Sequence, residues 1–204
     1  MSFCLIILAG GNSHRFNSNI GKPYQKIAGK SLIEINVIKA RKFKQIKKII
    51  LVYNKKDTKR VKSLKLQNVK LITGGKSRRQ STFNALKYLI NQKGTSKVLI
   101  HDVARPNFSL KLFSSILKNM KNARAVVPKI HIQDAIKQII DSSKDEYIVG
   151  KRRDNLFLTQ TPQAFNLKEL YHFHKKNSYK YKDDDISLYM DLNKVKFIEG
   201  EKNN

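Results

Sequence analysis

The sequence predicts an α/β fold with a mainly parallel β-sheet covered by helices on both faces. Short apolar runs alternate along the chain with longer segments whose apolar residues recur at helical spacing. Several of the short runs are almost continuously apolar, as in strands that are buried on both sides. Because strands that alternate with helices are joined by crossovers, they are expected to run parallel in one sheet.

The first half of the chain contains three repeats of this alternation. Apolar runs of strand length end in polar loops, and each is followed by a helical pattern, the first of which begins at Ser31, a residue type that favours helix N-termini. The elements expected in this half are strand Leu5–Leu8, a helix after Ser31, strand Lys48–Tyr53, helix Thr58–Leu64, strand Val69–Thr73 and a helix around Phe83–Ile90.

The second half continues the pattern and then interrupts it. Strand Val98–His101, helix Leu110–Met120 and strand Ala123–Pro128 come first. Residues 132–149 contain two apolar segments around a turn-rich pentamer, which predicts a hairpin arm at about 130–153. The core is expected to resume at Phe157–Pro162, followed by a helix from Asn166 to about Lys176, a helix capped by Asp183–Asp185 that runs through Leu192, and a strand at Val195–Ile198.

The bulk composition is that of one soluble domain spanning residues 1–204. Hydrophobic residues make up 40% of the chain, yet no apolar run approaches the roughly 18–20 residues that a bilayer requires. The N-terminus has no secretory pattern, so we expect a cytoplasmic protein without a membrane partner. Cys4, the single cysteine, lies in an apolar strand and is expected to be a buried thiol.

A formal net charge of +27, from 42 Lys and Arg against 15 Asp and Glu, raises nucleic acid as a partner. The lysines are nevertheless spread over nearly every predicted helix and turn. We therefore expect non-specific adhesion to polyanions at low salt and no specific nucleic-acid partner.

The loop after the first strand is the strongest candidate for chemistry. Gly10 and Gly11 allow backbone N–H groups to approach an anion closely, and Arg15 and Lys22 supply the two cation types that bind phosphate best. The loop lacks the ending of a P-loop and the third glycine of the dinucleotide fingerprint. A plain turn with solvated cations is the alternative interpretation of these residues.

Two further loops follow strands and are therefore expected at the same edge of the sheet. Gly75 and Ser81 could hold a base or ribose, or could only turn the chain. Asp102, directly after a strand, could hold Mg²⁺ together with substrate phosphates, or could cap the next turn and pair with Arg105. His101 is expected to be packed core.

Taken together, six motifs resemble the 2-C-methyl-D-erythritol 4-phosphate cytidylyltransferases, a family of the nucleotidyltransferase superfamily. They occur in family order over almost the whole chain: LAGGNSHRF, GGKSRRQS, HDVARP, QDAIK at 133–137, QTPQAF at 160–165, and DDIS at 184–187. The resemblance implies a Rossmann-like three-layer nucleotidyltransferase fold with a protruding β-hairpin arm. It also implies transfer of CMP from CTP to 2-C-methyl-D-erythritol 4-phosphate with Mg²⁺, in a homodimer whose arm reaches the partner.

The resemblance also assigns site residues. It implies that the catalytic cations are Arg15 and Lys22. The nucleotide would be bound by Ala9, Gly10, Gly11, Gly75, Ser81 and Asp102, with Asp102 also at the metal. The alcohol phosphate would be held by Arg105, Arg153 and the position of Ala135.

Two departures from the family pattern bear on activity. Ala135 stands where the family has a threonine hydroxyl for the substrate phosphate, and the chain ends at Asn204, before a family lysine and closing helix. We therefore expect a C-terminal end that is cut short, as in a shortened chain or the first half of a fusion, or else a chain adapted to another polyol phosphate, with CTP binding retained and turnover reduced. Ribitol 5-phosphate is the alternative substrate. A non-catalytic, basic nucleic-acid-binding protein on the same fold is the alternative from another class.

Overall fold

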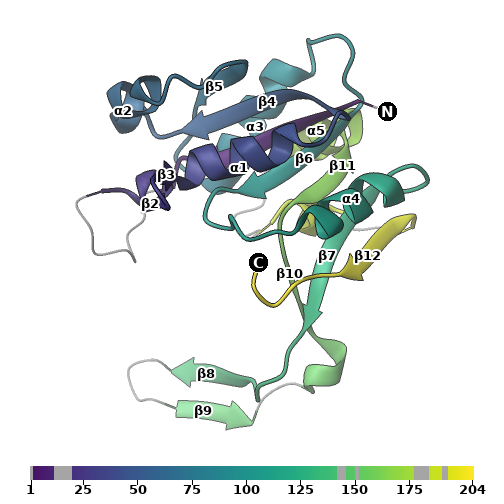
Figure 1. Cartoon of the computed structure of the whole chain (residues 1–204). Coiled ribbons are helices and arrows are strands. Elements are labelled where there is room, and N and C mark those ends of the chain that lie inside the picture. Colours follow the sequence, from purple (N-terminus) through teal and green to yellow (C-terminus); the bar gives the residue numbers. More distant parts are fainter. Residues whose placement is uncertain (1, 12–19, 142–145, 150–151, 177–183, 190–192) are drawn as a thin grey trace.

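The chain folds around one eight-stranded, mostly parallel sheet (Figure 1). The computed structural model describes residues 2–11, 20–141, 146–149, 152–176, 184–189 and 193–204. The strand order is β10-β7-β11-β6-β1-β4-β5, and β12 pairs with β7. The strands are β1 (Phe3–Ala9), β4 (Ile46–Tyr53), β5 (Val69–Thr73), β6 (Lys97–Asp102), β7 (Ala125–His131), β10 (Phe157–Thr159), β11 (Gln163–Asn166) and β12 (Val195–Glu199).

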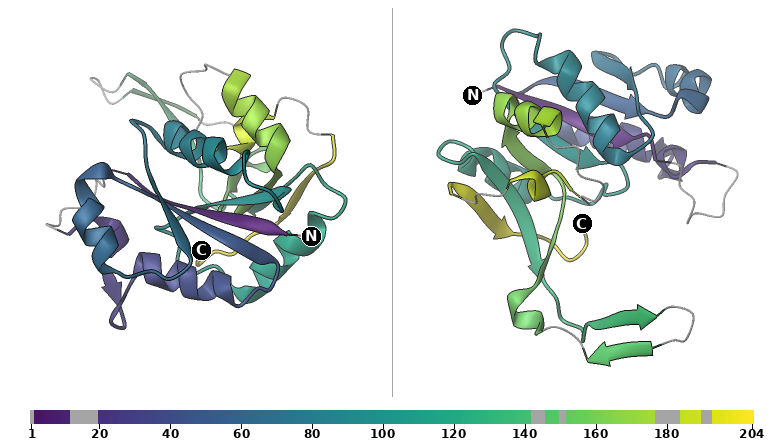
Figure 2. Two further views of the ribbon diagram at one scale, coloured as in Figure 1. Left: turned by 90° about the horizontal axis from the view of Figure 1, so that it is seen from above. Right: turned by 180° about the vertical axis from the view of Figure 1, so that it is seen from behind.

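Helices cover both faces of this sheet, which confirms the predicted three layers (Figure 2). The helices are α1 (Leu32–Arg41), α2 (Thr58–Ser63), α3 (Arg78–Leu89), α4 (Leu110–Asn119) and α5 (Leu167–Lys176). Side chains of β1 alternate between two apolar clusters, because successive residues of a strand point to opposite faces. Leu5 and Ile7 pack with α1 and α4, whereas Cys4 and Ile6 pack with α3 and α5.

Local sequence signals account for the starts of the predicted helices. Ser31 caps α1 as expected: its hydroxyl accepts from the backbone N–H of Glu34, while the Glu34 carboxylate accepts from the backbone of Ser31. Such a capping box contributes about 1 kcal/mol to helix stability. Cys4 is a buried free thiol, also as predicted.

The hairpin arm is present. β8 (Lys137–Asp141) and β9 (Glu146–Val149) pair antiparallel in a two-stranded sheet of their own. The arm projects from the end of β7, away from the main sheet (Figure 1). A second, much smaller ribbon joins β2 (Lys26–Ile27) to β3 (Lys30–Ser31) just before α1.

In the last quarter one prediction was wrong and another was confirmed only in part. The helix expected from Asp183 through Leu192 is only a 3-10 turn at Ile186–Leu188, and Tyr189 after it is extended; residues 183 and 190–192 lie outside the described residues. The Asp184 carboxylate does accept hydrogen bonds from the backbone N–H and the hydroxyl of Ser187. One such contact favours a first turn but does not extend it into a helix.

The segment Phe157–Pro162 resumes the core only in its second half, where Gln160 and Thr161 are 1% and 3% exposed. β10 is a short strand whose Phe157 and Leu158 are 40% and 52% exposed. The buried strand is β11, which inserts antiparallel between β6 and β7 and was not predicted. Its four residues are too few to display a periodicity.

Among the described residues, no helix combines the length and apolar character needed to cross a membrane.

Candidate active site

The carboxyl ends of four parallel strands meet at one edge of the sheet. Leu8 in β1 pairs with Asp102 in β6, Ala9 pairs with Tyr53 in β4, and Tyr53 pairs with Thr73 in β5. The loops that leave these strands therefore lie side by side, as predicted. In open α/β sheets this edge is where ligands bind.

The loop between β5 and α3 is shaped by Gly75 and Ser81. The backbone N–H of Gly75 donates to the Ser81 hydroxyl at 3.1 Å, and that hydroxyl donates to the carbonyl of Ser77 at 2.9 Å. A Cβ on Gly75 would lie 2.0 Å from Cγ and 2.5 Å from Cβ of Gln80. This position therefore requires glycine, and the Ser81 hydroxyl fixes the turn; Ser77 caps the helix.

The first loop lies against the second. Gly10 follows the buried Ala9, and a Cβ built on Gly10 would stand 3.7 Å from the Ser81 hydroxyl. Gly11 is exposed, with open space where its side chain would be. The structure thus brings Ala9, Gly10, Gly75 and Ser81 together.

The two predicted catalytic cations are placed differently. Arg15 lies outside the described residues. Lys22 is exposed at the start of a 3-10 turn that ends at the buried Tyr24. The Tyr24 ring lies under the guanidinium of Arg60, so the turn that begins at Lys22 packs beside α2.

Asp102 is held by a network that sequence reasoning missed. Its Oδ1 accepts from Nε of Arg78 at 3.2 Å, and Nη1 of Arg78 donates to Oδ2 of Asp185 at 2.7 Å. The other oxygen of Asp185 bonds Nε2 of His174 at 2.9 Å. The backbone N–H of Asp102 donates to the hydroxyl of Thr161 at 3.1 Å. The predicted alternative, a side-chain pair between Asp102 and Arg105, is not formed; only the backbone N–H of Arg105 bonds Asp102, through its carbonyl.

Electrostatic interactions keep Asp185 and Arg78 ionised although both side chains are largely buried. Burial by itself would raise the pKa of Asp185, but Arg78 and the hydrogen-bonded His174 lower it overall. Burial likewise acts against the charge on Arg78, and the two carboxylates more than offset it, so its pKa lies above the ordinary value. Asp185 and Arg78 are therefore both charged at neutral pH. In the sequence, Arg78 and Asp185 stand only within the separate motifs GGKSRRQS and DDIS, and neither motif indicates that the two side chains meet.

His101 is packed core, as predicted. Its Nε2 lies 2.8 Å from Oδ1 of Asn36 and 3.1 Å from the carbonyl of Arg105. Burial lowers the pKa of His101 to about 3, so the ring is neutral. The Asn36 amide in turn donates to the carbonyl of Val103. Together the two side chains hold the loop that carries Asp102 and Arg105.

The side chains at this edge fit a magnesium ion that takes one carboxylate from the protein and its other ligand atoms from a bound phosphate compound and water. Within the described residues, no group of three His, Cys, Asp or Glu side chains could hold a metal by itself. The Asp102 side chain is 33% exposed at the strand edge, with one of its oxygens engaged by Arg78. Mg²⁺ commonly takes one or two carboxylates and completes its shell with phosphates and water. Asp102 satisfies that requirement for a metal–triphosphate complex.

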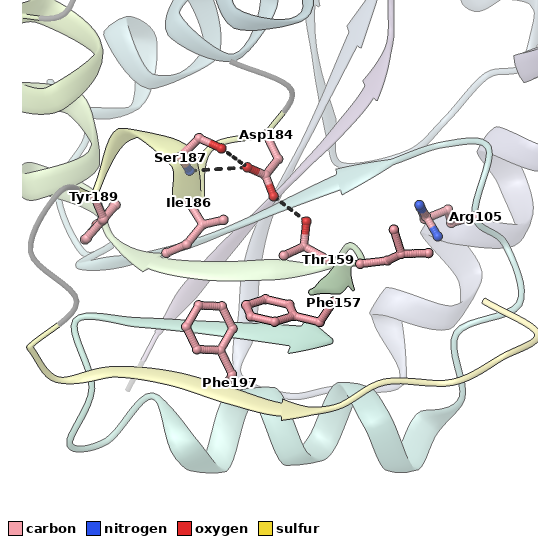
Figure 3. A pocket seen from close by; sticks show the side chains of 9 residues that line it. Arg105, Phe157, Thr159, Asp184, Ile186, Ser187, Tyr189 and Phe197 are labelled. Carbon is pink, nitrogen blue, oxygen red and sulfur yellow. Dashed lines mark hydrogen bonds between the residues drawn. The ribbon is translucent and has the colours of Figure 1, made fainter. Parts of the chain in front are cut away.

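Arg105 lies at one end of an open cavity of about 570 Å³ (Figure 3). Its Nη1 donates to the backbone carbonyl of Asn204 at 2.9 Å. The cavity has an aromatic side made by Phe157 and Phe197, whose ring centroids are 5.0 Å apart, and a polar side where Asp184 accepts from Thr159. Ligand pockets commonly have volumes of roughly 300–1,000 Å³.

The remaining predicted residues are on the arm. Ala135 is exposed just before β8, and Arg153 lies in the 3-10 turn after β9. Nη1 of Arg153 donates to the carbonyl of Gln133 at 2.6 Å, so Arg153 and Ala135 are close neighbours at the base of the arm. Within one chain, the arm formed by β8 and β9 lies apart from the main sheet (Figure 1).

The mostly parallel sheet, the glycine loops at its carboxyl edge and the Asp102 carboxylate define an α/β protein of the nucleotidyltransferase class. Residues 3–204 match the family described as 2-C-methyl-D-erythritol 4-phosphate cytidylyltransferase, IspD. The chain belongs to this family.

Individual relatives agree with this assignment. The chain is 43% identical over 204 residues to the "Bifunctional enzyme IspD/IspF" of Pelagibacter ubique, covering 100% of this chain and 54% of that protein. It is 33% identical to the cytidylyltransferase of Thermosipho africanus, covering 98% of this chain and 89% of the relative. The chain thus spans about half the length of the bifunctional relative.

Solved structures show the same fold. The crystal structure of 4-diphosphocytidyl-2C-methyl-D-erythritol synthase from Anaerococcus prevotii has a TM-score of 0.81 at 30% identity, covering 100% of this chain and 88% of that one. The bifunctional IspDF of Campylobacter jejuni has a TM-score of 0.83 at 27% identity, covering 100% and 51%. Family membership does not favour the alternative of a non-catalytic nucleic-acid-binding protein.

Proposed function

We propose that this chain transfers CMP from CTP to 2-C-methyl-D-erythritol 4-phosphate, acting as one cytidylyltransferase unit over residues 1–204. The observation that carries the proposal is the convergence of Gly10, the Gly75–Ser81 turn and Asp102 at one edge of the sheet. A family assignment alone would leave open whether this chain keeps a nucleotide site, and this geometry supports that it does.

The chemistry requires positioning and charge neutralisation. A phosphate oxygen of the alcohol phosphate attacks the α-phosphorus of CTP and forms the new P–O bond. The bond from the α-phosphorus to the bridging oxygen breaks, and pyrophosphate leaves with that electron pair. Because the attacking phosphate is already ionised, no strong general base is needed, and cations around the phosphorus supply the stabilisation.

Each predicted site residue has a role in this reaction. Backbone groups of Ala9, Gly10 and Gly75 would hold the cytosine, with Gly11 at the phosphates and Ser81 fixing the turn. Asp102 would bind the ribose and hold Mg²⁺, which would supply charge neutralisation at the triphosphate. Arg15 and Lys22 would stabilise the charge that develops on the α-phosphate.

We further propose that the active unit is a cytoplasmic homodimer in which the arm completes the partner's site. In the described residues, β8 and β9 pair only with each other, and an isolated two-stranded hairpin is marginal in water. Arg153, beside Ala135 at the base of the arm, would bind the incoming phosphate of the alcohol in the other subunit. Arg105 would bind it from the same chain, exchanging its contact with Asn204.

Pyrophosphate release tests the substrate assignment. The wild-type chain should release pyrophosphate from CTP, far more than from UTP or ATP, when 2-C-methyl-D-erythritol 4-phosphate is present. Ribitol 5-phosphate is the matched comparison, because it is also a polyol phosphate. Faster turnover with ribitol 5-phosphate would redirect the assignment to the alternative alcohol.

A complementation experiment tests the shared site. Lys22→Ala and Arg153→Ala should each be nearly inactive alone, whereas mixed dimers should regain activity because one of their two sites carries both intact residues. Absence of recovery after the subunits are shown to exchange would contradict a site that is shared between chains.

A further inference from the structure

We infer that Arg78 is a positioning residue that orients the Asp102 carboxylate for nucleotide binding. The inference deepens the proposed function and rests on it. The geometric observation is the bridge itself: one guanidinium bonds Asp102 at 3.2 Å and Asp185 at 2.7 Å.

The inner end of the bridge is firmly anchored. The side chains of Asp185 and His174 are 2% and 1% exposed, and they bond each other at 2.9 Å. The next residue, Arg79, donates through Nη2 to the backbone carbonyl of His174 at 3.0 Å. Arg79 therefore holds the backbone of His174 directly, whereas Arg78 reaches the side chain of His174 only through Asp185.

The outer end reaches the site. The Asp102 side chain is 33% exposed, and an exposed carboxylate would otherwise exchange between rotamers. Because the guanidinium is planar and its fork is fixed by Asp185, Nε has a defined position from which it selects one orientation of Asp102. Thr161 fixes the backbone of Asp102 at the same time.

This arrangement connects two parts of the proposed nucleotide site. Arg78 is the first residue of α3 and lies within the segment that the hydrogen bond from Gly75 to Ser81 closes. The group that holds Asp102 is therefore built into the same turn that would contact the base. We expect the Asp102 carboxylate, which would bind the ribose and the metal, to lose its orientation when Arg78 is removed. Arg78 itself would not touch the nucleotide.

A double-mutant cycle on CTP affinity, measured by calorimetry with Mg²⁺ present, tests the inference. Arg78→Gln and Asp102→Ala should each weaken binding by about tenfold, and the double variant should bind no more weakly than Asp102→Ala alone, because Arg78 acts through Asp102. If the two losses of CTP affinity multiply in the double variant, or if Arg78→Gln binds CTP with wild-type affinity, the inference is overturned. A merely structural role would also lower the thermal midpoint in proportion to the loss of affinity.

Arg124→Gln is the matched control. Arg124 has the same side-chain exposure, 28%, and also pairs with a carboxylate, Glu169, but it precedes β7 at the opposite edge of the sheet. Its replacement should leave CTP affinity unchanged. An equal loss in this variant would mean that any lost arginine pair weakens binding, which contradicts a specific role for Arg78.

A ligand-independent measurement separates the inference from the proposed function. In ¹⁵N-edited NMR spectra, the Nε–H of Arg78, which donates to Asp102, should exchange slowly in the wild type and rapidly in Asp102→Ala, whereas Glu169→Gln should leave it unchanged. If the wild-type chain binds no CTP, the proposed function fails; slow exchange that persists in Asp102→Ala overturns the bridge itself.

Discussion

Replacing Gly75 by alanine should weaken CTP binding by roughly one order of magnitude without unfolding the protein. The new methyl carbon would lie 2.0 Å from Cγ and 2.5 Å from Cβ of Gln80, with the backbone carbon of Gln80 at 3.3 Å. The exposed Gln80 side chain can turn away at Cγ, but its Cβ moves only with the first turn of α3. The loop must therefore shift.

The magnitude follows from the contacts that the shift disrupts. Overpacking of this kind costs about 1–3 kcal/mol. Loss of the hydrogen bond from Gly75 to Ser81 adds about 1 kcal/mol. If half of this total, about 1–2 kcal/mol, falls on the nucleotide complex, CTP affinity drops by about 5- to 30-fold, at roughly 1.4 kcal/mol per factor of ten.

Calorimetric titration of CTP, paired with a thermal melt, measures both effects. A compensating variant sharpens the test: Gly75→Ala with Gln80→Gly removes both of the closest atoms and should recover part of the affinity, with Gln80→Gly alone as its control. Wild-type affinity in Gly75→Ala would refute the reasoning, because the loop would then not be part of the nucleotide site.

Three further predictions concern other parts of the chain. Lys22→Ala should lower kcat about a hundredfold with an unchanged thermal midpoint, because the side chain is exposed and its charge acts on the transition state; unfolding would contradict the loop assignment. The ring of His101 is neutral in the folded protein, since burial lowers its pKa from 6.5 to about 3. The free energy of unfolding should therefore be highest above pH 6.5 and should decline towards pH 3 by up to about 1.4 kcal/mol per pH unit. Urea titrations at several pH values should show that the free energy of unfolding depends less steeply on pH in His101→Gln than in the exposed control His172→Gln. Gln160→Ala should cost about 2 kcal/mol in urea unfolding, because the buried Gln160 amide exchanges two hydrogen bonds with the backbone of Glu201; an unchanged midpoint would mean that these bonds contribute nothing.

The sequence was sufficient for the parts of the fold that depend on local patterns. The parallel strands, the capped helix after Ser31 and the hairpin arm each have a periodicity or a turn signal of their own, and all are present. The strand-end cluster followed as well, because parallel strands place their carboxyl ends at one edge.

Features that depend on long-range contacts could not be predicted in this way. Arg78 and Asp185 are 107 residues apart, and nothing near either residue indicates the other. The short strand β11 is defined by its neighbours β6 and β7, not by its own four residues. The expected helix after Asp185 failed because a capping residue favours a start but cannot extend a helix without packing.

Identification of the reaction products tests the central claim most directly. ³¹P NMR of the wild-type chain with CTP, Mg²⁺ and 2-C-methyl-D-erythritol 4-phosphate should show both substrates disappearing together and a CDP-alcohol and pyrophosphate forming in equal amounts. Unchanged spectra with a chain that is shown to be folded, or conversion of CTP to CMP without a CDP-alcohol, would contradict transfer of the cytidylyl group by this protein.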